Sequence, residues 1–381
     1  MEIHESGGQL VRSWASILEP STLQQALMTA RSDAMAGPLA LMPDAHLGAG
    51  STVGSVLLTH GIIPAAVGVD IGCGVSAFKT GIRRHEIDDE VARRILGRIR
   101  GTIPSGVGKA HSVASRRARE FVEWRGWPSI RDEARILSQF GTLGSGNHFA
   151  EVSEDLEGVV WVLVHSGSRG IGNQIARRHI NVARGLGTKV EHPDLSYLSP
   201  GSSELHEYVS DMLWAQDYAH HQREEMMEAL LAAVVENVAS QDAGRKEEVV
   251  YCHHNYSEEV GGGEWLSRKG AINADSEALG IIPGSMGAAT YIVKGKGNPD
   301  SYNSAPHGAG RMLSRGAARR ELDLEEFKSQ MIDRVWDDRN AQALLDEAPL
   351  AYKPIETVIE DSKDLVETVT VLKAFINYKG L

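Results

Sequence analysis

The stretch EGVVWVLVHSGSRGIGNQIARRHINVARGLG, from Glu157 to Gly187, decides the fold. It opens with an unbroken apolar run, Val159 to Val164, which is typical of a strand buried on both faces. That run is far shorter than the ~20 residues of a membrane-spanning helix. A Gly-rich turn follows His165, and NQIARRHINVARGLG then predicts a helix closed by glycine. The strand therefore ends at His165, where site residues are common.

The segments on either side continue this alternation. We expect strands broken by Gly and Pro from Ser51 to Thr80, and a helix over His85 to Arg100 with apolar residues at helical spacing. A second, long helix is predicted from Ser203 to Ser240. Within it, the segment QREEMME and the residues His206, His220 and His221 are interpreted as a charged, solvated face.

The last third of the chain predicts further strands and a helix. EEVVYCHHNYSEE is expected to be a strand ending in polar groups near His253 and His254. A helix is predicted around Leu322 to Trp336, and TVTVLKAFINYKG is predicted as the last strand. No repeat or low-complexity linker divides the chain and no clean domain boundary is visible, so the local patterns predict a fold of mixed α and β elements.

Composition narrows the function classes. Lys and Arg total 39 against 51 Asp and Glu, a net charge of −12, which excludes a generally basic nucleic-acid coat but allows a local basic groove. The two cysteines, Cys73 and Cys252, are too few for a disulfide framework and indicate a reducing compartment. The N-terminus has no basic start and no apolar core, so we expect no signal peptide and a cytoplasmic location.

A first group of motifs favours a metal site. GVDIGCGV, which follows PDAHLG along the chain, places Asp70 and Cys73 three residues apart between glycines. A thiolate and a carboxylate together suit a divalent metal such as Mn²⁺, Zn²⁺ or Fe²⁺. The alternative is a buried cysteine acting as a small apolar group beside an aspartate that makes turn hydrogen bonds.

Two histidine motifs have the same form, a strand or loop end that bears a histidine and is flanked by glycines. GSGNHFAEV carries Asn147, His148 and Glu151, and VHSGSRG carries His165 and Arg169. A single histidine is more often a satisfied core or surface residue than a ligand. Asp70, Cys73, His148, His165 and either His253 or His254 would together supply enough ligands for two metals, with the thiolate as bridge.

A second group of motifs favours phosphate binding. GIIPGSMG offers backbone N–H groups around Ser285, and HGAGR places His307 before a Gly-Ala-Gly turn, with Arg311 and Arg315 close behind. Neither a P-loop nor a dinucleotide-binding fingerprint is present. An ordinary Gly-rich loop with surface arginines is the alternative.

Seven motifs in order, PDAHLG, GVDIGCG, GTLGSGNHF, VHSGSRG, HHN, GIIPGSMG and HGAGR, resemble the RtcB family of GTP-dependent RNA ligases. The resemblance extends from about Leu41 to Lys379 and Gly380, nearly the whole chain. It implies a single α/β domain over residues 1–381, with central β-sheets surrounded by helices and the metals in a deep cleft. It also implies joining of RNA 3′-phosphate or 2′,3′-cyclic phosphate ends to 5′-hydroxyl ends, in RNA repair or tRNA splicing.

The resemblance implies a role for each matching residue. Two Mn²⁺ ions would be bridged by Cys73, and His254 is favoured over His253 because it directly precedes Asn255. His307 would attack the α-phosphate of GTP to give a histidine–guanylate, from which GMP passes to the RNA 3′-phosphate. The implied metal ligands are Asp70, Cys73, His148, His165 and His254. The implied nucleotide contacts are Asn147, Glu151, Asn255, Ser285, Ala309, Gly310, Tyr352 and Lys379, and the implied RNA contacts are Arg169, Arg311 and Arg315.

The sequence departs from the family pattern at Pro306, Ala288 and Thr290, positions that bear on the expected fine contacts to guanine and phosphate. Two other functions stay open, the first because it fits the metal ligands alone and the second because of these departures. A binuclear phosphoesterase would use the metal ligands but not His307 or Lys379, and a non-catalytic paralogue would bind RNA or nucleotide without joining ends. The resemblance does not specify an activator protein or an oligomeric state.

Overall fold

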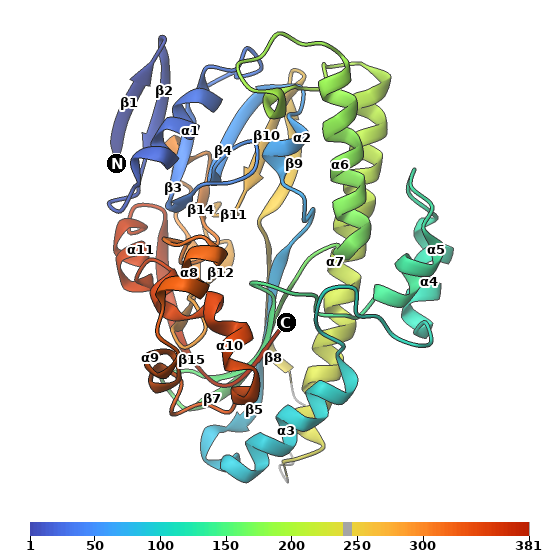
Figure 1. The fold of residues 1–381 in the computed structure, drawn as a ribbon, viewed down its shortest axis with the longest axis vertical. Helices are drawn as coiled ribbons and strands as arrows, with labels where there is room; N and C mark the ends of the chain where they lie inside the picture. The colour runs from blue at the N-terminus through green and yellow to red at the C-terminus, as the bar shows by residue number, and fades with distance from the viewer. Residues whose placement is uncertain (239–245, 381) are drawn as a thin grey trace.

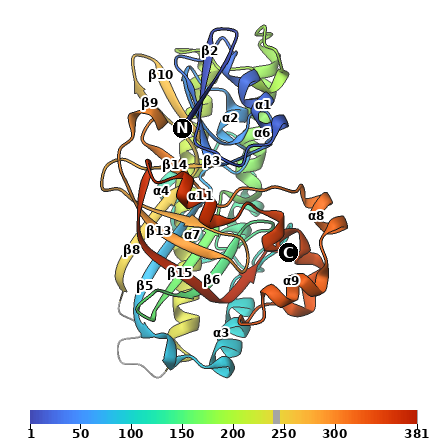
Figure 2. The same ribbon diagram turned by 90° about the vertical axis from the view of Figure 1, so that its left-hand side faces the viewer.

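The computed structural model describes residues 1–238 and 246–380, and it has two large β-sheets flanked by helices (Figure 1). The upper, six-stranded sheet has the order β1-β2-β3-β4-β10-β9, and the lower, seven-stranded sheet has the order β12-β13-β15-β6-β7-β5-β8. The strands β11 and β14 form a two-stranded sheet (Figure 1), and β14 lies between the two large sheets (Figure 2). This arrangement is the mixed α/β fold that the sequence predicts, whereas its description as a single domain stays a prediction.

The strands contain most of the buried, β-branched segments of the chain. They are β1 (Glu2–Ser6), β2 (Gln9–Ser13), β3 (Leu39–His46), β4 (Val53–His60), β5 (Gly74–Arg83), β6 (Phe149–Glu154), β7 (Val159–Ser166), β8 (Lys246–His253), β9 (Asn255–Gly261), β10 (Glu264–Lys269), β11 (Ala271–Asn273), β12 (Leu279–Pro283), β13 (Ala289–Gly295), β14 (Ser304–Pro306) and β15 (Val366–Lys379).

The helices differ widely in length, and the longest two are neighbours in space. They are α1 (Pro20–Ala30), α2 (Pro64–Val67), α3 (Asp89–Thr102), α4 (Arg116–Arg125), α5 (Glu133–Gln139), α6 (Arg169–Gly185), α7 (Ser203–Val235), α8 (Arg315–Glu321), α9 (Leu324–Gln330), α10 (Ala341–Leu344) and α11 (Ile355–Asp361). Short 3₁₀ turns connect several of them, including η2 (Pro193–Leu195) and η5 (Leu345–Glu347).

Strand register brings distant motifs to one end of the seven-stranded sheet. Gly74 at the start of β5 pairs with Ser166 at the end of β7 and with His253 at the end of β8. Phe149 at the start of β6 pairs with His165 on one side and with Lys379 on the other. The same end of the sheet therefore holds four residues that are far apart in sequence, Cys73, His148, His165 and Lys379.

The segment EEVVYCHHNYSEE differs from its prediction as one strand. It forms β8 up to His253 and β9 from Asn255, and these two strands belong to different sheets. His254 lies between them, and its backbone N–H donates to the carbonyl of Cys73 at 2.9 Å. The chain therefore crosses from one sheet to the other at the histidine that the sequence proposes as a ligand.

The helix α7 packs against β7 and β5 and against the neighbouring α6 (Figure 1). Its Met226, Met227 and Leu230 are fully buried in one core cluster with Val162 and Val164 of β7. Burial of each of these large apolar side chains stabilises the folded state by about 1.5–3 kcal/mol. The resulting core holds the site end of the sheet against a rigid helix.

The other element predictions agree with the structure except near the C-terminus. The predicted buried strand is β7, the helix after it is α6, and the last strand is β15. The predicted helix over Leu322 to Trp336 is wrong in length, because α9 ends at Gln330 and Trp336 instead packs on Phe327. The long helix predicted to Ser240 ends earlier, at Val235, and the last two predicted residues, 239 and 240, lie outside the described part of the chain. No helix in the described part of the chain combines the length and apolar character needed to cross a bilayer.

Candidate functional site

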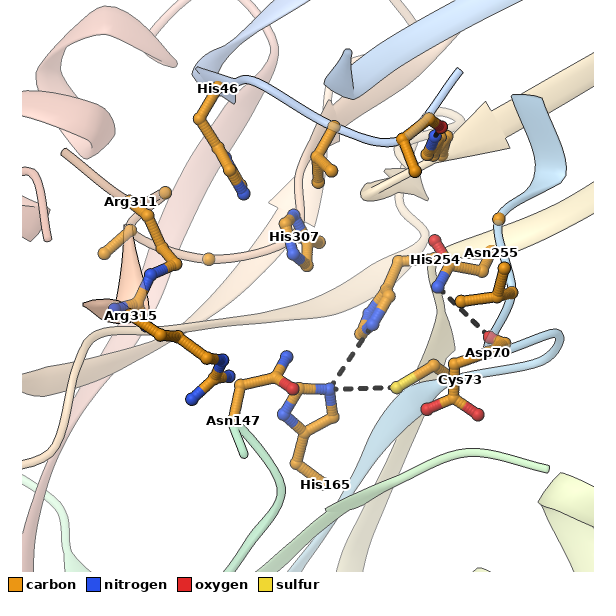
Figure 3. Close-up of a pocket in the computed structure, with 18 of the residues that line it drawn as sticks. His46, Asp70, Cys73, Asn147, His165, His254, Asn255, His307, Arg311 and Arg315 are labelled. Carbon is orange, nitrogen blue, oxygen red and sulfur yellow. Dashed lines mark hydrogen bonds between the residues drawn. The ribbon is translucent and has the colours of Figure 1, made fainter. Parts of the chain in front are cut away.

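A cavity of about 660 Å³ lies between the two large sheets and contains most of the predicted site residues (Figure 3). Among those that line it are Asp70, Cys73, Asn147, Glu151, His165, His254, Asn255, Ser285, His307, Ala309, Gly310, Arg311, Arg315, Tyr352 and Lys379. The other two predicted residues, His148 and Arg169, line an adjoining cavity of about 610 Å³. Asp70 borders both cavities, so the two spaces meet at the proposed metal ligands.

The five proposed metal ligands form a continuous chain of contacts. Cys73 Sγ lies 3.3 Å from His165 Nε2 and 3.4 Å from His148 Nε2. His148 Nε2 is also 2.9 Å from Asp70 Oδ2, and His165 Nε2 is 3.3 Å from His254 Nε2. The ligand atoms of Cys73, His148 and His165 all lie within 4.8 Å of one another and are buried. One thiol and three imidazoles with their nitrogens facing each other suit a divalent metal.

The protonation states also suit a metal. Burial holds the pKa values of His165 and His254 well below the ordinary value, so both imidazoles are neutral and have a free lone pair. The Nδ1 atom of His148 lies 2.9 Å from the carbonyl of Leu143, which directs Nε2 toward the cluster. Burial raises the pKa of Cys73, and a bound cation is what would convert this thiol to a thiolate. The residues present therefore fit a metal centre.

The loops that carry these ligands are held by α7. Arg223 NH1 donates to the carbonyls of Gly72 at 2.7 Å and Ser166 at 2.8 Å, and Gln222 Nε2 donates to the carbonyl of Gly167 at 2.9 Å. The interpretation of QREEMME as a charged surface is wrong for these two residues, because Arg223 is 3% exposed and Gln222 is fully buried. Carbonyls at two loop ends need donors, and α7 supplies them.

His307 follows β14 and faces the metal ligands from the opposite side (Figure 3). Its ring centroid lies 4.6 Å from that of His254. Asp44 of β3 is fully buried, and its Oδ2 lies 2.6 Å from Nδ1 of His307 and accepts from the His307 backbone N–H at 3.1 Å. The carboxylate therefore holds the backbone of His307 and lies beside Nδ1 of its ring, which leaves Nε2 available.

The backbone around His307 must approach β3 closely. Gly310 has a φ of +74°, and a Cβ at this position would lie 2.1 Å from the Asp44 carbonyl. Only glycine fits this space and this dihedral angle. The Gly-Ala-Gly turn therefore has a physical reason, which is to bring His307 to Asp44.

Ion pairs organise the far end of the cavity. Lys379 Nζ lies 2.8 Å from Glu347 Oε2, and Arg315 NH1 lies 2.6 Å from Asp346 and 2.5 Å from Glu347. Burial alone would raise the pKa of Glu347, but the neighbouring cations Lys379 and Arg315 lower this pKa to about 2. The C-terminal strand β15 is therefore tied into the site by a buried lysine.

Tyr352 and Arg311 belong to the same network. Tyr352 donates its hydroxyl to Glu347 at 2.8 Å and accepts from Arg311 NH1 at 2.7 Å. The guanidinium of Arg311 lies 4.7 Å from the centre of the Tyr352 ring. The structure thus brings together Tyr352, Arg311, Arg315 and Lys379, which the sequence singles out separately.

Glu151 and the two asparagines line the space between these groups. Burial raises the pKa of Glu151 to about 7, and its carboxylate accepts a hydrogen bond from Asn377. The backbone carbonyl of Asn147 accepts a hydrogen bond from Lys379 Nζ at 3.3 Å. Asn255 bridges the halves of the site, because its side chain donates to the Asp70 carbonyl at 3.1 Å and accepts from the Gly270 N–H at 3.0 Å.

Sequence reasoning missed several residues of this site. Asp44 was inside the quoted motif PDAHLG, and an acidic residue in a Gly- and Pro-flanked motif was the available signal. Asp346 and Glu347 lie in the segment LLDEAPL, which has no pattern to mark them. Lys269 was likewise missed, and its Nζ donates to three backbone carbonyls beside the cavity.

The fold and the site define a class of protein in which a buried cluster of Cys and His side chains that could hold a metal faces, across one cavity, a histidine beside a buried carboxylate. The family model described as "tRNA-splicing ligase RtcB" matches residues 25–129 and 125–380 of the chain. The chain belongs to the RtcB family.

Three relatives show how far the likeness extends. RNA-splicing ligase RtcB1 of Escherichia coli is 36% identical over 395 residues, and RNA-splicing ligase RtcB of Escherichia coli K12 is 35% identical over 395 residues. Each comparison covers 95% of this chain and 95% of the relative. The tRNA-splicing ligase RtcB of Thermococcus kodakarensis is 29% identical over 418 residues, which cover 89% of this chain and 86% of that protein.

Proposed function

We propose that this protein is an RNA ligase that joins 3′-phosphate or 2′,3′-cyclic phosphate ends to 5′-hydroxyl ends, using GTP and Mn²⁺. The observation that carries the proposal is the pairing of His307 Nδ1 with the buried Asp44 carboxylate at 2.6 Å, inside the cavity that also contains the candidate metal ligands. A nucleophilic imidazole needs a neutral ring with its proton on the other nitrogen, and a carboxylate beside Nδ1 favours the tautomer that leaves Nε2 unprotonated.

His307 forms the covalent bond in this mechanism. Its Nε2 attacks the α-phosphorus of GTP, the bond to the β-phosphate oxygen breaks, and pyrophosphate leaves with the electron pair. A 3′-phosphate oxygen of RNA then attacks the same phosphorus, and the P–N bond breaks to return the electron pair to Nε2. Finally the 5′-hydroxyl loses its proton and attacks the RNA 3′-phosphorus, and GMP leaves.

Asp70, Cys73, His148, His165 and His254 would hold the two Mn²⁺ ions, with Cys73 between them. The metals would supply Lewis-acid stabilisation of phosphate charge. The ligand spacing supports this assignment, because Cys73 Sγ contacts an imidazole nitrogen on each side. His254 is favoured over His253 because its Nε2 faces His165, whereas the ring of His253 packs on Tyr256.

The guanine would lie near Glu151, Lys379 and Tyr352. An ionised carboxylate can accept from the N–H groups of guanine, an ammonium can donate to its carbonyl, and a phenol ring can stack on its face. Asn147, Asn255, Ser285, Ala309 and Gly310 would contact the rest of the nucleotide. Arg169, Arg311 and Arg315 would contact RNA phosphates, which accounts for a nucleic-acid substrate on a chain with net charge −12.

The test is incubation with α-labelled GTP and Mn²⁺, comparing the wild type with His307→Ala. The expected result is label on the wild type alone, lost in acid and kept in base, as for a phosphoramidate. The matched control is His253→Ala, which removes a histidine of similar burial beside the ligands but outside their contacts.

Either of two results would contradict the proposal. Equal labelling of the wild type and His307→Ala would exclude His307 as the nucleophile. Absence of label on the wild type with metal bound would favour the phosphoesterase or a non-catalytic paralogue, and release of phosphate from RNA ends by His307→Ala would identify the former.

A further inference from the structure

The main cavity continues past the metal ligands along one face of α6. Arg177, Ile180, Asn181 and Arg184 all line it, and their spacing of three and four residues places them in one stripe of the helix. The opposite stripe, which includes Ile171, Ile175 and His179, is buried. The stripe therefore faces an open part of the cavity that none of the proposed catalytic groups occupies.

Arg177 is the available charge in this stripe. Its side chain is exposed and has no ion pair or hydrogen-bond partner within residues 1–238 and 246–380. Arg184 is different, because it pairs with Asp194 of η2 across the same part of the cavity. Arg178, the residue after Arg177, points away from the cavity, since it donates to Ser129 Oγ at 2.9 Å and to Glu207 at 2.6 Å. An unpaired arginine beside an amide side chain suits a phosphodiester backbone.

The helix begins at the metal ligands and leads away from them. Arg169, its first residue, lies 3.5 Å from His148 Nδ1 through NH1. Arg177 is eight residues further on, or about 12 Å along the axis at ~1.5 Å per residue. At ~3.4 Å per stacked nucleotide, this distance corresponds to roughly three or four nucleotides.

The chemistry decides which of the two RNA strands lies there, and this step rests on the proposed function. The activated end is RNA joined through its 3′-phosphate to GMP, so the nucleotide and the 3′ strand are one molecule and must share one continuous space. The stripe on α6 and the groups proposed for GTP line the same cavity. The adjoining cavity, which meets the main one at Val69 and Asp70, stays available to the second strand.

We propose that the α6 face formed by Arg177, Ile180, Asn181 and Arg184 binds the single-stranded RNA that precedes the 3′-phosphate, with Arg177 contacting a phosphate three or four nucleotides upstream of the end.

The test is direct binding, measured by fluorescence anisotropy on the Mn²⁺-loaded protein. The main probe is an eight-nucleotide RNA with a 3′-phosphate and a fluorophore on its 5′ end, which can bind only as the 3′-phosphate strand. The second probe has two nucleotides and the same ends. The third has eight nucleotides, a free 5′-hydroxyl and the fluorophore on its 3′ end. The variants are Arg177→Ala, the charge-preserving Arg177→Lys, and the matched control Arg178→Ala.

For Arg177→Ala we expect the Kd of the main probe to rise by about tenfold, as for loss of one charge-assisted contact. The slope of log K against log salt should fall by about 0.7, and Arg177→Lys should restore most of both effects. The two-nucleotide probe and the 5′-hydroxyl probe should bind wild type and Arg177→Ala alike, and Arg178→Ala should bind the main probe as the wild type does.

Equal losses in Arg177→Ala and Arg178→Ala, no loss in either, or an equal loss on the two-nucleotide probe would overturn the proposal. A loss confined to the 5′-hydroxyl probe would assign the face to the other strand and would overturn it as well. Because binding is measured without catalysis, these outcomes are distinct from a failure of GTP labelling, which would contradict the proposed function alone.

Discussion

Asp44 shows how much one buried side chain decides at the residue scale. It is fully buried, contacts His307 through both the ring and the backbone, and lies on a strand of the six-stranded sheet. Lys353 donates to the carbonyls of Pro43 and Ala45 at 2.9 and 2.8 Å and so holds the backbone on both sides of it. The orientation of the proposed nucleophile thus depends on residues that never contact substrate.

We expect Asp44→Asn to slow GMP transfer to His307 by about 10²- to 10⁴-fold, because an amide neither fixes the required tautomer nor stabilises positive charge on the ring. The measurement is the rate of protein labelling with α-labelled GTP. Bound Mn²⁺ should be unchanged, since Asp44 is not among the proposed ligands. A variant that labels at the wild-type rate would remove Asp44 from the mechanism.

Glu151 gives a pH prediction with a defined sign. Burial raises its pKa from 4.5 to about 7 despite the nearby Lys379, so the folded protein binds this proton more tightly than the unfolded chain does. The resulting stability is full below pH 4.5 and is lost as the pH rises through 7, a difference of about 3 kcal/mol.

Glu151→Gln mimics the protonated side chain and should remove this dependence. Urea unfolding of both proteins at pH 5 and pH 8 checks it, with the variant gaining stability relative to the wild type at the higher pH. Parallel pH profiles for the two proteins would show that the Glu151 carboxyl ionises normally.

At the scale of elements, strand ends and one helix carry the site. The β8–β9 connection changes sheets at His254, and α7 holds the Gly72 and Ser166 loops through Arg223. Arg223 lies 151 positions from Gly72 in the sequence. A long helix packed on the sheet can therefore position loops whose own sequences are mostly glycine.

We expect Arg223→Met to destabilise the protein by about 2–4 kcal/mol, because two buried carbonyls lose their donor while the apolar stem is kept. Urea unfolding measures this loss, and Mn²⁺ binding should weaken in the same variant. Glu228→Gln on the exposed face of the same helix is the control, with an expected change within about 0.5 kcal/mol. Equal stability of the two variants would contradict the positioning role of Arg223.

For the whole molecule, the decisive feature is that two sheets meet at one cavity. The seven-stranded sheet places Cys73, His148 and His165 at the ends of its strands. The six-stranded sheet carries Asp44, which contacts His307 on the other side of the cavity. A metal bound at this junction would connect segments that are separate in the unfolded chain.

Each bound Mn²⁺ should therefore stabilise the folded protein by about 2.7 kcal/mol at a hundred times its Kd, which is roughly 3 °C in Tm per ion for a chain of 381 residues. Calorimetry with Mn²⁺ and with a chelator tests this. Cys73→Ala should lose this rise in Tm. It should also bind less metal than a variant that lacks a ligand of only one ion, because a bridging thiolate serves both ions. Unchanged metal content in Cys73→Ala would exclude bridging.

The alternation of buried strands and helices was predictable from the sequence, because the spacing of apolar residues along each segment indicates which of its faces is buried. The run Val159 to Val164 is buried throughout as β7, and the glycine-closed helix after it is α6. The C-terminal helix was predicted too long, because Trp336 packs on Phe327 from outside the helix and apolar spacing alone cannot distinguish the two cases.

The sequence by itself determined the mixed α/β class, the motifs and, through the family resemblance, which residues belong to one site. Only the tertiary structure decided that Asp44 meets His307, that Arg223 is buried, and that Glu347 pairs with Lys379. The physical reason is that each of these contacts joins segments that are distant in sequence. Local spacing records which face of an element is buried, whereas strand register and sheet packing decide what that face meets.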